Sequence, residues 1–276
     1  MSSSDTSGMT ATLHLARQLA TDLADAAGEV IRPYFRTRLN VDRKADQTPV
    51  TVADREAERV MREMLSAQVP QHGVIGEEFG SDRPDAEWVW VLDPIDGTKA
   101  FISGQPTFGT LIALLHNGEP ILGVIDQPVL HERWIGTAEG TTFNGESTAV
   151  RRQEMLSAAT LYATDPAMFL GSDADAFGEL SLRCGLTRYG LDCYAYGLLA
   201  LGFVDLVVEA EMQLYDYAAL VPIVEGAGGR ISDWEGRPLR LLSEASSPRA
   251  APTGGRVIAA GDSDLLELAL GHLRGE

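Results

Sequence analysis

Two carboxylates at the end of an apolar segment give the clearest sign of chemistry in this chain. The apolar residues 88–92 run directly into Asp93-Pro94-Ile95-Asp96-Gly97-Thr98. Such a run predicts a buried strand, and ligands of open α/β sheets sit beyond strand ends of this kind. An Asx turn with a helix N-cap explains one aspartate and the glycine, but not two aspartates followed by a threonine. The pattern therefore favours a cation site.

Three further acidic residues, Asp54, Glu77 and Asp216, also follow predicted strands or begin predicted helices. Taken alone, Asp54 and Asp216 are expected to be helix N-caps, and Glu77 a solvated strand end. Together with the first pair they resemble a site for hard cations, which prefer oxygen ligands. Because like charges raise one another's pKa values, five carboxylates need neutralisation in a cleft. Roughly two or three Mg²⁺ ions with a phosphate monoester would bring the charge near balance.

The same arrangement suits phosphoryl transfer to water. One metal ion lowers the pKa of a water molecule to form the nucleophile, and others bind the phosphoryl and leaving oxygens. Gly97 and Thr98 are expected to open a helix whose backbone N–H groups face the phosphate. Thr98 would also orient the water, with Glu77 accepting its proton.

Composition limits the partners of this site. The chain has 276 residues and a net charge of −18, which argues against nucleic acid and anionic membranes as ligands. A small phosphorylated substrate stays compatible with that charge when metal ions are bound. The sequence shows no secretory signal pattern, and no apolar run approaches membrane-spanning length. With Cys184 and Cys193 expected as reduced thiols, we predict a cytoplasmic protein.

The elements that position these residues fall into two halves. We expect a disordered tail over residues 1–9, an N-terminal half over 10–152, and a C-terminal α/β half over 153–276 that completes the cleft. The first half is predicted to contain helices at 10–38 and 53–68 and strands near 74–76, 87–92, 107–116, 120–126 and 133–137. The second half is predicted to alternate strands (159–163, 203–208, 229–232, 256–260) with helices (166–183, 193–201, 217–227, 263–273).

At this point the chain resembles the inositol monophosphatase family, within the wider fold of fructose-1,6-bisphosphatase. The resemblance spans nearly the whole chain. The matching motifs are Pro49-Val50-Thr51-Val52-Ala53-Asp54, Gly76-Glu77-Glu78, Asp93 to Thr98, Tyr215-Asp216-Tyr217-Ala218-Ala219 and Glu225-Gly226-Ala227-Gly228-Gly229. It implies a layered α/β/α/β/α sandwich, a Mg²⁺-dependent phosphomonoesterase and a homodimer.

The resemblance also implies roles for individual residues. Metal would be bound by Glu77, Asp93, the carbonyl oxygen of Ile95, Asp96 and Asp216. Asp54 would serve a third, weaker metal ion.

Departures within the family point to a substrate branch. Residue 100 is Ala where many members have Asn, and Tyr215 stands where many have Trp. The runs at 100–104, 123–128 and 188–197 look most like the histidinol-phosphatase branch. There, Asp192 and Glu209 would join Asp96 and Asp216 in contacting the substrate. Histidinol phosphate carries an ammonium and an imidazole, which two added carboxylates would complement.

Some alternative interpretations stay open, and the sequence disfavours others. Asp192 as a helix N-cap and Glu209 as an exposed strand end remain open. Inositol 1-phosphate and adenosine 3′,5′-bisphosphate are the alternative substrates, and a non-enzymatic scaffold would be expected to have lost its acidic residues. The i, i+3 spacing of Asp93 and Asp96 differs from the D-x-D of haloacid-dehalogenase phosphatases. No nucleotide-binding loop and no G-x-S-x-G elbow is present.

Overall fold

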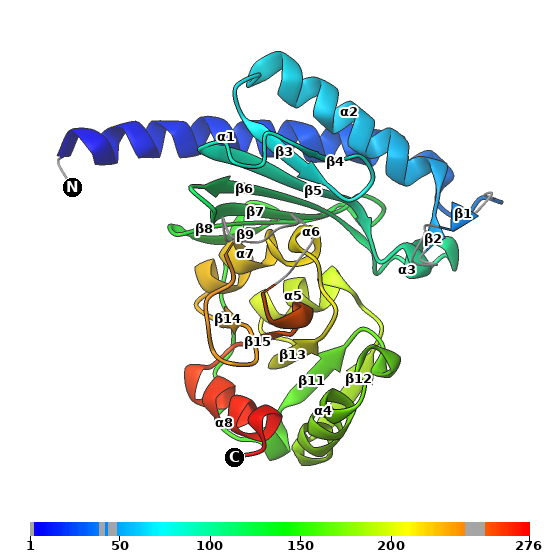
Figure 1. The fold of residues 1–276 in the computed structure, drawn as a ribbon, viewed down its shortest axis with the longest axis vertical. Helices are drawn as coiled ribbons and strands as arrows, with labels where there is room; N and C mark the ends of the chain where they lie inside the picture. Colours follow the sequence, from blue (N-terminus) through cyan, green and yellow to red (C-terminus); the bar gives the residue numbers. More distant parts are fainter. Residues whose placement is uncertain (1–2, 39–41, 44–48, 241–251) are drawn as a thin grey trace.

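The computed structural model describes residues 3–38, 42–43, 49–240 and 252–276. Its helices and two sheets form five layers in the order α/β/α/β/α, as expected (Figure 1). The outer layer of the N-terminal half consists of α1 (Ser3–Ile31) and α2 (Val52–Gln68). The middle layer contains α5 (Cys193–Ala200), α6 (Leu214–Tyr217) and α7 (Leu220–Gly226). The outer layer of the C-terminal half consists of α4 (Ser172–Arg183) and α8 (Ser263–Arg274).

The larger sheet has eight strands in the order β10-β9-β8-β7-β6-β5-β3-β4. Neighbouring strands are antiparallel except for β3 and β5, which run parallel. The strands are β3 (Gly73–Gly76), β4 (Gly80–Asp82), β5 (Trp88–Asp96), β6 (Gly109–His116), β7 (Glu119–Gln127), β8 (Glu132–Thr137), β9 (Gly140–Phe143) and β10 (Glu146–Thr148). A separate pair, β1 (Asp42–Arg43) and β2 (Pro49–Val50), precedes α2.

Strand β5 is apolar from Trp88 to Leu92 because both of its faces are covered there. Val89 and Val91 pack into the cluster between the two sheets, whereas Trp90 and Leu92 pack against the layer of α1 and α2. This two-residue alternation of faces is the normal strand geometry. It explains why the sequence before Asp93 shows no polar positions.

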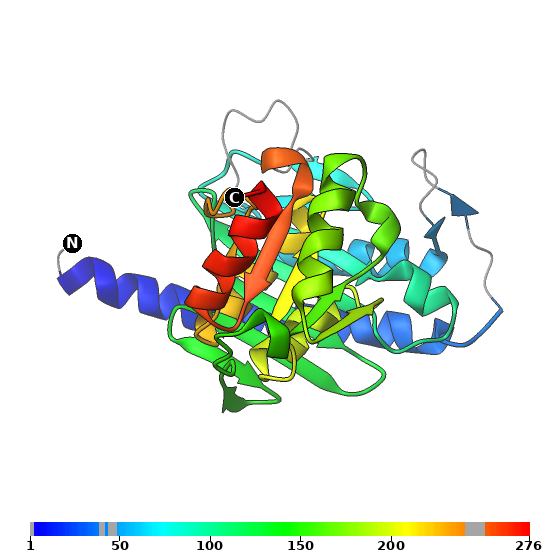
Figure 2. The same ribbon diagram turned by 90° about the horizontal axis from the view of Figure 1, so that it is seen from below.

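The smaller sheet has five strands in the order β12-β11-β13-β15-β14. They are β11 (Thr160–Ala163), β12 (Leu186–Tyr189), β13 (Leu206–Glu209), β14 (Arg230–Ser232) and β15 (Val257–Ala260). The strands β11, β12 and β13 are parallel, and β15 pairs antiparallel with β13 and β14. In Figure 2 the helices α4 and α8 lie side by side over the outer face of this sheet.

The structure corrects several predicted boundaries. Residues 3–9, expected as a disordered tail, belong to α1, which begins at Ser3. The helix predicted over 166–183 is a 3₁₀ turn (Pro166–Met168) followed by α4, because Gly171, with φ +56°, separates them. The helix expected over 217–227 is α6 and α7. The short edge strands β4, β10 and β12 were not predicted, since three or four half-exposed residues give little periodicity.

Candidate active site

The two aspartates of the opening motif face the same side of the large sheet because β5 contains an irregularity. Residues three apart in a regular strand point to opposite faces. The pairing of β5 with β6 shifts register between Asp93 and Asp96, and Ile95 between them packs on the opposite side, with the α1 and α2 layer. Pro94, which cannot donate to the ladder, fits such a bulge. The hydroxyl group of Thr110 donates to its carbonyl oxygen at 2.8 Å.

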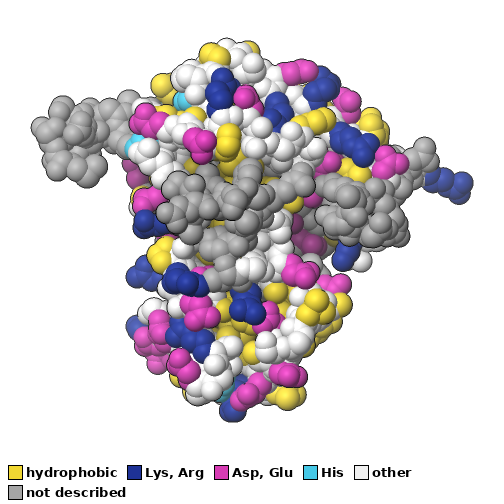
Figure 3. Space-filling view, viewed as in Figure 1, with side chains coloured by type: hydrophobic (Ala, Val, Ile, Leu, Met, Phe, Trp, Pro, Cys, Tyr) yellow, Lys and Arg dark blue, Asp and Glu magenta, His cyan; other side chains and the backbone are white. Residues whose placement is uncertain are grey.

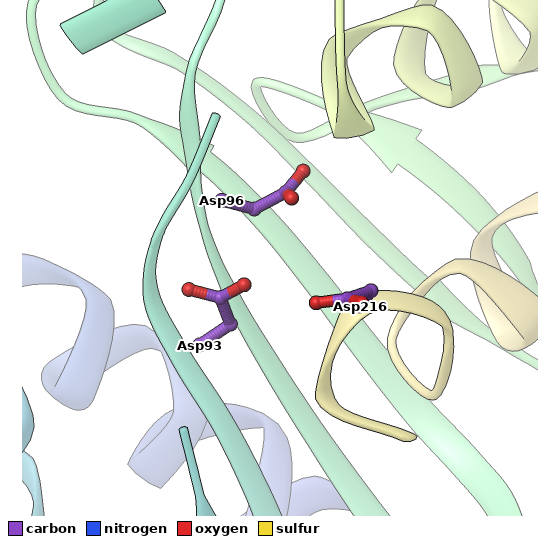
Figure 4. A group of neighbouring side chains, drawn as sticks. All are labelled: Asp93, Asp96 and Asp216. Atoms are coloured by element: carbon purple, nitrogen blue, oxygen red, sulfur yellow. The ribbon is translucent and has the colours of Figure 1, made fainter. Parts of the chain in front are cut away.

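Asp216 reaches this pair from the middle layer. In Figure 4 the carboxylates of Asp93 and Asp96, from β5, and of Asp216, from α6, point into the same space. One oxygen of each lies within 4.8 Å of the others. Asp216 was expected as an N-cap, but it is the third residue of α6. There it accepts the backbone N–H of the cap residue Gln213 at 2.6 Å. One of its oxygens is thereby fixed and the other is turned to the cluster.

Glu77 follows β3 and lies beside the same cluster. Its backbone N–H donates to the carbonyl oxygen of Leu92 at 3.2 Å, which continues the pairing of β3 with β5. Its carboxyl group is hydrogen-bonded to that of Asp93. Burial raises the pKa values of Asp93, Asp96 and Asp216, and the like charge of Glu77 raises each further. For Asp96 the result is a pKa of about 6.

Asp54 is held at the start of α2 by a capping box. The N-cap is Thr51, and Asp54 is the third helical residue, so the expectation that Asp54 itself is the cap is corrected. The backbone N–H and the hydroxyl group of Thr51 donate to its Oδ2 at 2.8 and 2.6 Å. Its other oxygen, Oδ1, lies 3.5 Å from the hydroxyl oxygen of Thr98. Burial raises the pKa of Asp54, and the charge of Glu77 adds to this.

Gly97 and Thr98 begin a short helix, α3 (Thr98–Ile102), as the sequence predicts. Gly97 takes φ +87°, and a side chain there would meet the Asp192 carboxyl group at 3.0 Å. The hydroxyl group of Thr98 lies 3.1 Å from the carbonyl oxygen of Ile95. Thr98 thus joins the Asp54 carboxylate to the backbone of the acidic turn.

Asp192 occupies the N-cap position of α5, but its side chain caps nothing. The first N–H of the helix, that of Cys193, donates instead to Asp96 Oδ2 at 2.6 Å. Asp192 has φ +49° and ψ −138°, a conformation that L residues rarely adopt. Burial raises its pKa to about 8, and the charge of Asp96 contributes. Asp192 therefore lies at the predicted N-cap position, but its side chain makes no capping hydrogen bond.

Glu209 ends β13 and is buried rather than exposed. It is 4% exposed, and its Oε1 accepts the backbone N–H of Thr164 at 3.2 Å as well as the Thr164 hydroxyl group. Burial raises its pKa to about 8 despite these hydrogen bonds. The expectation of an exposed strand end is therefore wrong.

Four of these side chains, those of Asp96, Asp192, Glu209 and Asp216, line one cleft of about 330 Å³ between the two halves of the chain. Its acidic lining residues are Asp96, Asp165, Asp192, Glu209, Glu211 and Asp216. Among the described lining residues the single basic one is Lys99, which lies 3.8 Å from Asp165. A cleft with this imbalance attracts cations.

The donor set fits a hard divalent cation. Two oxygens bound to one Mg²⁺ at about 2.1 Å are at most about 4.2 Å apart. The carboxylate oxygens of Asp93, Asp96 and Asp216 approach this spacing without metal, all lying within 4.8 Å of one another. Burial and mutual repulsion raise the pKa values of all three carboxyl groups, so a bound cation would stabilise their ionised form.

Sequence reasoning missed the groups that hold the acidic residues. These are Thr51 behind Asp54, Cys193 behind Asp96, and Thr164 behind Glu209. The T-x-x-D spacing of Thr51 and Asp54 is a capping-box signal that was available. The other two contacts join residues 97 and 45 positions apart, and no local pattern predicts such contacts.

Figure 3 shows acidic and basic side chains interspersed on the face it presents, without a continuous basic area among the described residues. None of the helices in the described ranges combines the length and the apolar character that a membrane span requires.

Comparisons with known proteins agree with this site. The chain is 52% identical over 254 residues to the bifunctional phosphatase IMPL2, chloroplastic, of Arabidopsis thaliana, covering 91% of this chain and 72% of that one. It is 38% identical over 246 residues to the histidinol-phosphatase of Chlorobaculum parvum, covering 88% and 95%. A solved inositol monophosphatase from Zymomonas mobilis superposes with a TM-score of 0.82 at 50% identity, covering 93% and 96%.

The family model named "Inositol monophosphatase family" matches residues 13–275. This match includes every acidic residue of the cleft and both sheets. The chain therefore belongs to the inositol monophosphatase family and is a phosphoric monoester hydrolase.

Proposed function

We propose that this protein hydrolyses L-histidinol phosphate to L-histidinol and phosphate with the help of Mg²⁺. The observation that carries the substrate assignment is a pair of carboxyl groups, the half-buried Asp192 and the buried Glu209, which line the same cleft as Asp96 and Asp216. Among the described residues neither forms an ion pair with a basic side chain. A substrate with its own positive charge would supply the missing partner.

Histidinol phosphate meets this requirement and inositol phosphate does not. It carries an ammonium group and an ionisable imidazole beside the phosphorylated alcohol, whereas inositol phosphate has only hydroxyl groups there. The raised pKa values of Asp192 and Glu209, both about 8, are what burial without a cation produces. A bound cation would lower both pKa values and keep the carboxyl groups ionised. The histidinol-phosphatase relative at 38% identity supports the same substrate.

The proposed metal ligands are Glu77, Asp93, the Ile95 carbonyl oxygen, Asp96 and Asp216, with Asp54 for a third ion. When bound there, Mg²⁺ supplies positive charge to the phosphoryl oxygens and lowers the pKa of the attacking water. Thr98, which lies between Asp54 and Ile95, would orient that water, and Glu77 would accept its proton. The backbone N–H groups of Gly97 and Thr98 at the start of α3 would bind the phosphate; in the structure that of Gly97 is hydrogen-bonded to the Asp96 carboxyl group. Asp96 and Asp216 border both the metal cluster and the substrate space.

Steady-state kinetics with Mg²⁺ test the proposal. We expect kcat/KM for histidinol phosphate to exceed that for inositol 1-phosphate and for adenosine 3′,5′-bisphosphate. Inositol 1-phosphate is the second candidate because the Zymomonas mobilis inositol monophosphatase is 50% identical. A higher kcat/KM for inositol 1-phosphate would overturn the substrate assignment while leaving the phosphatase intact.

The variant Asp192→Asn separates charge recognition from general damage. Losing one partner of a buried charged pair costs at least about 2 kcal/mol, so kcat/KM for histidinol phosphate should fall by about 30-fold or more. An aryl phosphate, whose aryl group carries no positive charge, should lose much less. The matched control is Asp165→Asn. Asp165 lines the same cleft but is paired with Lys99. An asparagine at this position can still accept the hydrogen bond that the backbone N–H of Ala167 donates to Asp165 Oδ1. Equal losses for both substrates in Asp192→Asn would count against its recognition role.

A further inference from the structure

The turn that carries Glu77 is held from behind by helix α2. This turn joins β3 to β4, and Glu77 is followed in it by Glu78 and Phe79. The backbone N–H groups of Glu78 and Phe79 donate to the two carboxylate oxygens of Glu58, at 2.8 and 3.2 Å. Glu58 is fully buried. Both amides that follow Glu77 are thus fixed by one side chain that does not itself line the cleft.

Arg62 completes this attachment. Its Nε lies 2.7 Å from Glu58 Oε1, and its terminal amino group donates to the carbonyl oxygen of Gly80 at the far end of the turn. The glycine before Glu77 is required by the same contact. A Cβ on Gly76 would lie 2.0 Å from Glu58 Oε1, so the carboxylate occupies the space of that missing side chain.

Helix α2 therefore contacts the site through two residues on one of its faces, Asp54 and Glu58. Asp54, Glu58 and Arg62 are spaced four residues apart and so lie along one side of the helix. Asp54 contacts Thr98 at the acidic cluster, and Glu58 binds the Glu77 turn one helical turn further on. The backbone N–H of Glu77 is fixed on the other side by Leu92, the residue before Asp93. The relative position of Glu77 and Asp93 depends on both attachments.

We propose that Glu58, supported by Arg62, is a positioning residue that presents Glu77 to the metal ion. This proposal rests on the proposed function, in which Glu77 is a metal ligand and proton acceptor. What distinguishes this pair is that Glu58 binds the two backbone amides that directly follow Glu77. Hydrogen-bonded partners that orient metal ligands typically change metal affinity about 10- to 100-fold when they are lost.

The test uses metal binding in the absence of substrate. In Glu58→Gln one carboxylate oxygen is replaced by an amide NH₂ group, which cannot accept a hydrogen bond from the backbone N–H that faces it. We expect the affinity of the EDTA-treated protein for Mn²⁺, measured by electron paramagnetic resonance, to fall about 10-fold or more. The KM for Mg²⁺ in turnover should rise, with a smaller change in kcat at saturating Mg²⁺. Arg62→Gln should shift both quantities in the same direction by less.

The matched control is Asp205→Asn. Asp205 is also fully buried, pairs with Arg151 through two contacts of 2.6 Å, and accepts a backbone N–H, that of Thr160, at 2.7 Å. It lies at the start of β13 in the small sheet, so its loss should lower Tm without changing the Mn²⁺ affinity of the folded protein.

The outcomes distinguish this inference from the proposed function. If the unmodified protein binds no Mn²⁺ and needs no Mg²⁺, the proposed function fails. If it binds Mn²⁺ and the Glu58→Gln and Arg62→Gln proteins bind it equally well, the positioning role is overturned and the phosphatase proposal stands. Should Glu58→Gln fail to fold, the Mn²⁺ affinity of Arg62→Gln alone decides.

Discussion

Buried acidic residues occur in two regions of this molecule and are treated differently in each. In the scaffold, every such carboxylate has an arginine within 2.6–3.1 Å: Glu58 with Arg62, Asp126 with Arg133, Asp205 with Arg151, Asp233 with Arg237, and Asp262 with Arg152. At the cleft, Asp93 and Glu209 are buried and Asp96, Asp192 and Asp216 half-buried, and none of the five forms an ion pair among the described residues.

The difference shows what each region requires. A scaffold carboxylate gains an arginine as its ion-pair partner when the chain folds. The cleft carboxylates have no such partner and raise one another's pKa values, so a cation from solution would be needed to balance their charge. The missing arginines are thus as informative as the aspartates present. They leave room and negative charge for the metal ions and the cationic substrate that we propose.

The largest expected effect comes from removing a carboxylate of the cluster. Asp93→Asn should lower kcat by more than about 100-fold, the upper end for loss of an outer partner of a metal ligand. It should leave the fold intact and raise the Tm of the metal-free protein, because one repelling buried charge is gone. Turnover and differential scanning calorimetry measure the two effects. Near-normal turnover would contradict the ligand role of Asp93.

The scaffold should respond in the opposite way. Arg151→Met leaves Asp205 fully buried without its cation, which costs about 3 kcal/mol of unfolding free energy. We expect kcat and the KM for Mg²⁺ of the folded protein to stay unchanged. Urea unfolding followed by circular dichroism measures the loss. If Arg151→Met were as stable as the unmodified protein, the distinction between the two regions would lose its basis.

The sequence predicted much of the site because its residues lie at marked local boundaries. Asp93 and Asp96 end a strand whose apolar run reflects cover on both faces, and Gly97 and Thr98 open the short helix α3 as predicted. The five-layer fold was predicted from the family resemblance. Four of its five matching motifs meet at the acidic cluster, whereas the fifth, at residues 225–229, lies at the end of α7. Most of the long helices and strands appear where periodicity places them.

What the sequence could not give depends on contacts between distant segments. The register shift in β5 that turns Asp93 and Asp96 to one face exists only against β6. The burial of Glu209 depends on Thr164 and on the layers around β13. Glu58 is visible in the sequence as a carboxylate on the apolar face of α2, yet its binding of the Glu77 turn requires the folded chain.

The metal-free cleft should also give a pH-dependent stability. The ordinary pKa values of Asp192 and Glu209, 3.8 and 4.5, rise to about 8 in the folded protein. Between about pH 4 and pH 8 the native state therefore holds protons that the unfolded state releases. The unfolding free energy should fall as pH rises through this window, by up to about 1.4 kcal/mol per pH unit for each group. Denaturant titrations with EDTA measure the slope.

A double variant, Asp192→Asn with Glu209→Gln, is the control for this slope. It should reduce the slope by the share of these two groups and leave the share of Asp93, Asp96 and Asp216, whose pKa values are also raised. Asp205→Asn should leave the slope unchanged. An equal slope in the double variant and the unmodified protein would contradict the assignment to Asp192 and Glu209.

The smallest expected effect concerns the backbone of Asp192. Its φ of +49° with ψ −138° is a conformation that glycine adopts without strain, and such strain costs about 1 kcal/mol or more. Asp192→Gly should therefore raise Tm by roughly 2–3 °C relative to Asp192→Asn, which also removes the charge but keeps the Cβ. Both variants should lose activity on histidinol phosphate to a similar degree. A higher Tm for Asp192→Gly would show that the backbone conformation of Asp192 costs stability, so that the residue is kept for its carboxylate and not for folding. Equal Tm values for the two variants would contradict this interpretation.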